Sequence, residues 1–291
     1  MIQLALPQSE IILPVTGKAL RVLPLTVKHK LQIAESELLT MSSRLKFISE
    51  LAFDRIVDKD VFQENYETFL RNVYEPDIEA IYYGVMQATY RKPIPFIITC
   101  PKCGHVNEVE VPVEQLIKTL RINQGGQDKY YLEQHKVEVS EYGLTFVLKL
   151  PSLYDIIKVF KFAEQNNFNF LKESVKAESF EDLMLKLSPY AILSGLIMIQ
   201  TSDGQVVKND TSSIALMNEC LEVLLSLTED ILSEVHEFLV KLKGKYAYEF
   251  GFQYICQNPN CESFNNREYQ EATVDILNQF FPIPIEKLLQ E

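Results

Sequence analysis

The sequence predicts an α+β fold, predominantly helical, made of two pseudo-repeated halves that each end in a cysteine knuckle with short strands. Two cysteine pairs lie far apart in the chain, Cys100-x2-Cys103 and Cys256-x4-Cys261. A similar order of strand, helix start and exit strand surrounds each pair. In the segments that precede each cysteine pair, apolar residues recur at helical spacing, which indicates amphipathic helices with one buried face.

This repetition sets the predicted organisation of the chain. We expect a first repeat at residues 1–120, a linker at 121–138 and a second repeat at 139–291. The linker contains a Gly-Gly pair among polar residues, which is typical of an exposed loop. The second repeat carries an insertion at about 166–212 for which the first has no counterpart.

The elements of the first half follow from local signals. Residues 10–14 and 19–23 form two extended stretches around a Thr-Gly turn, and a helix is expected after Thr26. Thr26 has His29 where a capping box has an acidic residue. A second helix begins at Glu75-Pro76-Asp77, because proline and carboxylates suit a first helical turn. Strands at 96–99 and 108–113 then enter and leave the first knuckle.

The second half repeats this order. A strand at 144–150 leads to Ser152, whose spacing from Asp155 predicts a helix N-cap. A helix with an acidic start at Glu229 precedes strands at 252–255 and 269–276 around the second knuckle. Within the insertion, residues 183–199 are a helix candidate, and Ser202-Asp203-Gly204 predicts a hairpin turn.

Composition narrows the class of protein. The chain has 291 residues, of which 47% are hydrophobic, so it can bury a large core. Its net charge of −12 disfavours nucleic acid, because no cluster of Lys and Arg interleaved with aromatic residues offsets the repulsion of phosphates. The longest apolar run, at 191–199, has about half the length needed for a membrane span, and no span is expected.

The four paired cysteines Cys100, Cys103, Cys256 and Cys261 are candidate ligands of a structural Zn²⁺ ion. Each pair supplies two thiolates and a structural site needs four, so one site assembled from both halves is the simplest interpretation. His105 could replace one thiolate.

Other interpretations of the pairs are a disulfide in each knuckle, a redox C-x-x-C or four free thiols. The first residues carry no signal-peptide pattern, and a fifth cysteine, Cys220, stands alone in an apolar helical stretch. Both observations favour reduced thiols. A redox C-x-x-C opens a helix, whereas the residues after Cys103 indicate a strand.

No catalytic pattern is present. The four histidines are not in H-E-x-x-H or nucleophile-base spacing, and there is no Gly-rich phosphate loop. His236 is expected at the surface of an acidic helix. A metal held by four cysteines has no open position for water. We therefore expect no enzyme activity, no catalytic residues and no cofactor-binding residues beyond the metal ligands.

The order of short motifs resembles that of the T4-type bacteriophage baseplate hub subunits, a family also described as T4 bacteriophage base plate proteins. The residues that carry the resemblance are Leu13-Pro14-Val15-Thr16-Gly17-Lys18, Leu23-Pro24-Leu25-Thr26, Glu75-Pro76-Asp77 and Cys100-Pro101-Lys102-Cys103-Gly104. It covers most of residues 10–120 and recurs more weakly in 139–281. The chain departs from the family pattern at three places. It has Leu23 before the proline where the family has an Arg, its second knuckle is C-x4-C, and it carries the insertion.

This resemblance implies a structural or assembly role in the tail baseplate of a contractile-tailed phage, with other tail and baseplate proteins and the tape measure as partners. It places the protein in the virion, or in the host cytoplasm during assembly. Two alternatives stay open. One is a zinc-ribbon regulatory protein that binds nucleic acid. The other is an assembly chaperone for hub or tape-measure proteins that is absent from the virion.

Overall fold

The computed structural model describes residues 6–177 and 179–283. The structure is 48% helical and 21% strand, and its strands form antiparallel sheets. The predicted α+β class is therefore confirmed, but the expectation of a predominantly helical fold is wrong. Several strands are short and mix polar with apolar residues, as in Ile117–Arg121 and His135–Val139, so they lack the long apolar runs that mark a buried sheet.

The first half begins and ends with a hairpin. Its elements are β1 (Ser9–Ile12), β2 (Ala19–Val22), α1 (Val27–Glu35), α2 (Met41–Arg55), α3 (Tyr66–Asn72), α4 (Glu75–Thr89), β3 (Ile94–Thr99), β4 (Val106–Val111) and β5 (Ile117–Arg121). The predicted helix starts after Thr26 and at Glu75, and the strands around the first knuckle, are confirmed.

The second half repeats this order of hairpin, helices and knuckle strands. Its elements are β6 (His135–Val139), β7 (Leu144–Leu148), α5 (Leu153–Gln165), α6 (Phe170–Lys176), α7 (Phe180–Gly195), β8 (Leu196–Thr201), β9 (Val206–Lys208), α8 (Ile214–Leu225), α9 (Glu229–Gly244), β10 (Ala247–Tyr254), α10 (Glu262–Asn265), β11 (Gln270–Thr273) and α11 (Ile276–Phe280).

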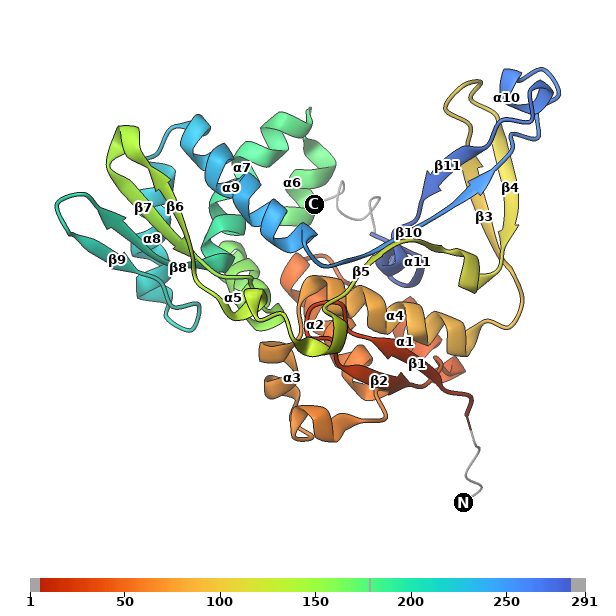
Figure 1. The fold of residues 1–291 in the computed structure, drawn as a ribbon, viewed down its shortest axis with the longest axis horizontal. Coiled ribbons are helices and arrows are strands. Elements are labelled where there is room, and N and C mark those ends of the chain that lie inside the picture. Colours follow the sequence, from red (N-terminus) through yellow and green to blue (C-terminus); the bar gives the residue numbers. More distant parts are fainter. Residues whose placement is uncertain (1–5, 178, 284–291) are drawn as a thin grey trace.

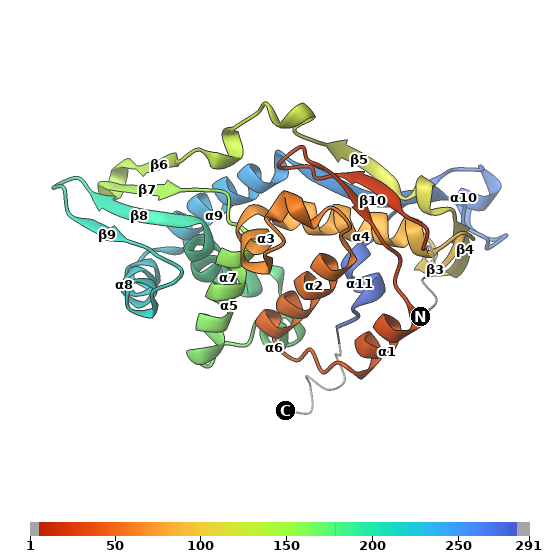
Figure 2. The ribbon, with the colours of Figure 1, turned by 90° about the horizontal axis from the view of Figure 1, so that it is seen from below.

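Two groups of strands lie at opposite ends of the molecule, with most of the helices and the β1–β2 hairpin between them (Figures 1 and 2). At one end β6, β7, β8 and β9 form a four-stranded sheet in that order. At the other end the β3–β4 hairpin and the strands β10 and β11 project from the body with α10 at their tip. We call residues 94–111 and 251–273 the ribbon lobe.

One sheet joins the two halves of the chain. β10 pairs with β11 through Gly251–Tyr254 and with β5, from the first half, through residues 247–250. Residues more than 120 positions apart are therefore neighbours in this sheet, for example Ala247 and Arg121. The second cysteine pair follows β10 of this sheet, whereas the first is carried by the separate β3–β4 sheet.

Helix α4 is the centre of the larger apolar cluster. It is buried on nearly every side, as expected for a helix that is apolar all round. Gly84 lets β1 and β2 approach closely, since a Cβ there would lie 2.5 Å from Ile11 Cγ2 and 2.8 Å from Val22 Cγ2. On a different side of the helix, the ring of Tyr83 lies 5.4 Å from that of Phe250 in β10.

The two apolar clusters do not follow the chain halves strictly. The cluster around α4 includes Leu153, Phe250 and Phe281 from the second half. The other cluster, around α7 and α9, includes Val15 and Tyr74 from the first half. The predicted linker at 121–138 contains two 3-10 turns and most of β6. The division into repeats at 1–120 and 139–291 stays a prediction.

The helix caps follow the expected chemistry. At α5, the Ser152 hydroxyl accepts from the Asp155 N–H and the Asp155 carboxylate accepts from the Ser152 N–H, as predicted. At α1, His29 replaces the acidic residue of the capping box, because its Nδ1 accepts from the Thr26 N–H at 3.0 Å. The imidazole thus accepts the hydrogen bond from the N-cap backbone N–H, which an acidic side chain accepts in an ordinary capping box.

In the insertion, the hairpin predicted at Ser202-Asp203-Gly204 is confirmed as the β8–β9 turn. The helix expected at 183–199 is partly wrong, because α7 ends at Gly195 and the next residues form β8. A Cβ at Gly195 would lie 2.8 Å from the Lys149 carbonyl oxygen, so this close approach favours glycine. Apolar residues stand on both sides of Ser194 and Gly195, so hydrophobicity alone does not mark the boundary between the helix and the strand.

Asp77 is a fully buried carboxylate at the start of α4. It accepts hydrogen bonds from the backbone N–H groups of Val15 and Tyr74. Burial raises the pKa of Asp77 to about 7 from an ordinary value of 3.8, although the two N–H donors lower it. A carboxyl that binds its proton more tightly in the folded state stabilises that state at low pH. This contribution is lost as the pH rises through about 7.

We therefore expect the variant Asp77→Asn to gain stability relative to the native chain as the pH rises from 4 to 7. The limiting slope is about 1.4 kcal/mol per pH unit. Urea unfolding of both chains at pH 5 and pH 7 measures the difference in free energy of unfolding. Parallel pH profiles for the two chains would show that Asp77 does not titrate in this range.

In the parts of the chain that the structure describes, no helix combines the length and the apolar character required to cross a membrane.

Candidate metal centre

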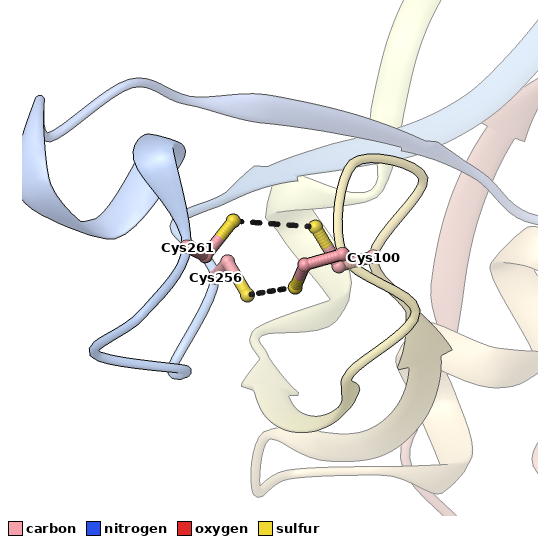
Figure 3. Close-up of side chains that lie close together, drawn as sticks. Cys100, Cys256 and Cys261 are labelled. Carbon is pink, nitrogen blue, oxygen red and sulfur yellow. Dashed lines mark hydrogen bonds between the residues drawn. The ribbon is translucent and has the colours of Figure 1, made fainter.

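The four predicted ligands converge on one point of the ribbon lobe. Figure 3 shows Cys100 approaching from the β3–β4 hairpin and Cys256 and Cys261 from the loop between β10 and α10. The Sγ atoms of Cys100 and Cys261 are 3.9 Å apart, and those of Cys103 and Cys256 are 3.7 Å apart. All four Sγ atoms lie within 4.8 Å of one another. The structure thus brings together the four residues that the cysteine spacing indicates.

These distances fit a tetrahedral thiolate site. Zn–S bonds of about 2.3 Å at tetrahedral angles place sulfur atoms about 3.8 Å apart. The two closest pairs match this spacing. Cys100, Cys256 and Cys261 are buried and Cys103 is exposed, so one edge of the cluster faces solvent. Four sulfur donors around one point favour Zn²⁺ or another thiophilic ion over Mg²⁺ or Ca²⁺.

The first knuckle is shaped by a tight turn. The Gly104 N–H donates to the Cys100 carbonyl at 2.9 Å, and the Cys100 N–H donates to the His105 carbonyl at 2.8 Å. Gly104 has a φ of 71°, in the left-handed region that favours glycine. The turn folds Cys103 back beside Cys100, which is why the Cys-Pro-Lys-Cys-Gly pattern suits two ligands of one ion.

The second knuckle is longer and is held by its asparagines. The Cys261 N–H donates to the Asn258 carbonyl at 2.9 Å, and the Asn260 N–H donates to Asn258 Oδ1 at 3.0 Å. The Asn258 side-chain amide also lies 3.7 Å from the sulfur of Cys103 in the other knuckle. Amide donors beside sulfur atoms stabilise thiolates, so this loop supports metal ligation as well as shape.

Asn107 links the two knuckles, a role that no motif in the sequence indicates. Its side chain is fully buried, and Nδ2 donates to the carbonyl oxygens of Ile98 and His105. Its Oδ1 accepts from the Gln257 N–H at 2.7 Å. A buried amide with all these partners fixes the separation of the cysteine pairs. An asparagine in a short polar strand carries no local signal for such a contact.

The acidity of the thiols differs across the cluster. Burial raises the pKa of Cys256 to about 11. Burial also acts to raise the pKa of Cys261, but hydrogen bonds, first among them that from the Ser263 backbone, outweigh it and lower the pKa to about 7. Thiolates crowded at these distances repel one another, and a divalent cation among them removes that repulsion.

The alternative interpretations of the cysteines fare differently. All five cysteines are free, so neither knuckle is closed by a disulfide in the structure. Cys103 leads into β4 and not into a helix, unlike a redox C-x-x-C.

Two predictions about histidines are also decided by the structure. His105 is exposed and lies outside the ligand cluster. His236 is half-buried and not a surface side chain as expected, with Nδ1 2.8 Å from Ser188 Oγ.

Ion pairs also connect the halves around the site. Lys102 Nζ lies 2.5 Å from Glu268 Oε2, joining the two knuckles. Lys118 of β5 pairs with Glu271 of β11, across β10. Each pair is exposed and contributes little on its own.

The comparisons with known proteins assign the family. The family model described as T4 bacteriophage base plate protein matches residues 6–282. No curated protein and no solved structure matches the chain. The family match covers both knuckles, the insertion and nearly the whole chain. The chain therefore belongs to the T4 bacteriophage base plate protein family.

Proposed function

We propose that this protein is a structural component of the hub of a contractile phage tail baseplate, or a factor in hub assembly, and that it acts through contacts with other tail proteins. The observation that carries this proposal is the family match over residues 6–282. Its partners are other tail and baseplate proteins, including the tape measure. The protein assembles in the host cytoplasm and resides in the tail baseplate of the virion.

The proposal includes one structural Zn²⁺ ion held by Cys100, Cys103, Cys256 and Cys261. The support is the convergence of four sulfur atoms at tetrahedral spacing. Four protein ligands leave no position for water or substrate, so the ion would serve folding and not catalysis. Because each half supplies two ligands, the ion would hold residues more than 150 positions apart.

We propose no enzymatic activity. Among the described residues, two hydroxyl–imidazole pairs resemble a nucleophile and its base. One is Thr26 with His29, whose Nδ1 already accepts from the Thr26 backbone N–H, and the other is Ser188 with His236. The Ser188 hydroxyl donates to the Met184 carbonyl at 2.7 Å, so its proton is not directed to the imidazole. Burial lowers the pKa of His236, which favours a neutral ring whose Nδ1–H donates to Ser188. This arrangement is the reverse of an activated serine.

The charges near the knuckles disfavour the nucleic-acid alternative. Near the knuckles, the positive charge of Lys102 is paired with Glu268. The adjacent strand β4 exposes Glu108 and Glu110, which repel phosphates. A regulatory zinc ribbon would need the opposite charge on this lobe.

Mass spectrometry of purified virions tests the proposed location. We expect peptides of this protein in intact particles and in isolated baseplates, at a constant ratio to the other baseplate proteins. Its absence from virions, together with its presence in infected-cell assembly intermediates, would instead identify the assembly chaperone. Peptides from abundant host proteins serve as the measure of contamination.

A further inference from the structure

The outer face of the β3–β4 hairpin is an exposed apolar surface. The strand register places Ile97 opposite Glu108, Thr99 opposite Val106 and Pro95 opposite Glu110. These side chains share one face, because alternate residues of a strand point the same way. Ile97 is 75% exposed and Val106 is 55% exposed. Large aliphatic side chains so close together on a projecting hairpin are typical of a binding surface.

The inner face of the same hairpin accounts for its packing. Phe96 is buried, and its ring lies 5.1 Å from that of Phe252 in β10. Asn107 and Val111 are buried on this side as well. The hairpin therefore has no internal need for apolar residues on its outer face, where polar residues would be expected.

Two carboxylates flank the exposed apolar residues. Within residues 6–177 and 179–283, Glu108 and Glu110 take part in no ion pair, whereas Glu268 and Glu271 in the same lobe are paired with lysines. Glu108 lies directly opposite Ile97 in the register. The surface is thus apolar at its centre and negatively charged along one strand.

A groove of about 410 Å³ adjoins this surface. β4 lines it with Val109, Glu110 and Val111, and the other side is formed by β5 and β10 through Ile117 and Phe252 among others. Its lining mixes apolar and polar side chains and includes the Lys118–Glu271 ion pair, so the groove itself does not select a basic side chain.

We propose that this surface, formed by Pro95, Ile97, Val106, Glu108 and Glu110, binds a protein partner that presents apolar side chains flanked by lysine or arginine. The inference rests on the proposed function, because the partner is another protein of the tail baseplate. Charge complementarity to the unpaired glutamates selects a basic partner. The sheet and the cysteine cluster hold the lobe in its shape, so binding needs little ordering.

Genetic complementation tests the surface in the assembling phage, where every tail protein is present. A phage lacking this gene is grown on hosts that supply the native chain, Ile97→Glu with Val106→Glu, or the control Val206→Glu. Val206 lies on β9 at the far end of the molecule and is 43% exposed. Plaque-forming efficiency and the yield of complete tails are measured. Each purified variant is checked for circular dichroism and metal content.

We expect the double variant to fold and to bind metal like the native chain, but to reduce plaque-forming efficiency by at least about 100-fold, as for the loss of an interface hot spot. The control should complement normally. Complementation by a folded double variant at the native level would overturn the proposal. If the phage lacking the gene still forms plaques, the proposed baseplate function fails, a result distinct from failure of the surface alone.

Charge variants test the chemistry of the partner and do not depend on the apolar substitutions. Glu108→Lys with Glu110→Lys should impair tail assembly far more than Glu108→Gln with Glu110→Gln, because lysines repel a basic partner. If the lysine and glutamine double variants both complement at the native level, the proposal that the partner is basic is overturned. Sedimentation of the native chain tests whether a second copy of this chain occupies the surface instead. Self-association abolished by Ile97→Glu would assign the surface to a second copy and overturn the proposal.

Discussion

Replacing Cys256 with serine is expected to release the metal ion and to lower the free energy of unfolding by more than about 4 kcal/mol. Structural zinc sites contribute about 10–16 kcal/mol of apparent binding free energy, and removing one of four thiolates forfeits much of it. The variant also leaves a buried hydroxyl beside three thiols in the ribbon lobe. Urea unfolding and metal analysis of the purified chains measure both effects.

Two comparisons make this result specific. Cys100→Ser, in the other half of the chain, should lose the same metal with a similar destabilisation, if the proposed site takes ligands from both halves. Cys220→Ala should retain the metal, because Cys220 is buried in α8 away from the cluster. Unchanged metal content in Cys256→Ser would mean that this thiol is not a ligand.

Phe250→Ala is expected to destabilise the protein by about 3–5 kcal/mol, the usual cost of removing a buried aromatic side chain. Phe250 lies in β10 and is 5% exposed. Its ring is 5.4 Å from that of Tyr83 in α4 and 5.9 Å from that of Tyr248. The substitution therefore opens a cavity where the last part of the chain packs on the central helix of the first half. Thermal and urea unfolding measure the loss.

The matched control is Phe264→Ala. Phe264 lies on α10 at the tip of the ribbon lobe and is 43% exposed, so we expect a loss of less than about 1 kcal/mol. If both alanine variants unfolded at the same urea concentration, β10 would not be part of the core around α4.

The residues of the candidate site were predictable because their chemistry is local. Two cysteines separated by a tight turn mark a knuckle wherever they occur, and four sulfur ligands are what a structural zinc ion requires. The helix starts at Glu75 and Ser152 were predictable for the same reason, since caps depend on residues within one turn.

Other features depend on residues far away in the sequence and were not predicted. β5 is a strand because β10 pairs with it, and its sequence of Ile117-Lys118-Thr119-Leu120-Arg121 carries little apolar signal of its own. Asn107 owes its role to Gln257, 150 positions away. The proportion of helix was overestimated because short, half-exposed strands resemble loops in composition.

The central claim is that one metal ion, held by two cysteines from each half, joins the chain at the ribbon lobe. X-ray absorption of the purified protein, combined with elemental analysis, tests it most directly. We predict one zinc per chain with four sulfur neighbours at about 2.3 Å. Pure, folded protein with four reactive thiols and no bound metal would contradict the claim, as would a zinc signal with nitrogen or oxygen in the first coordination sphere.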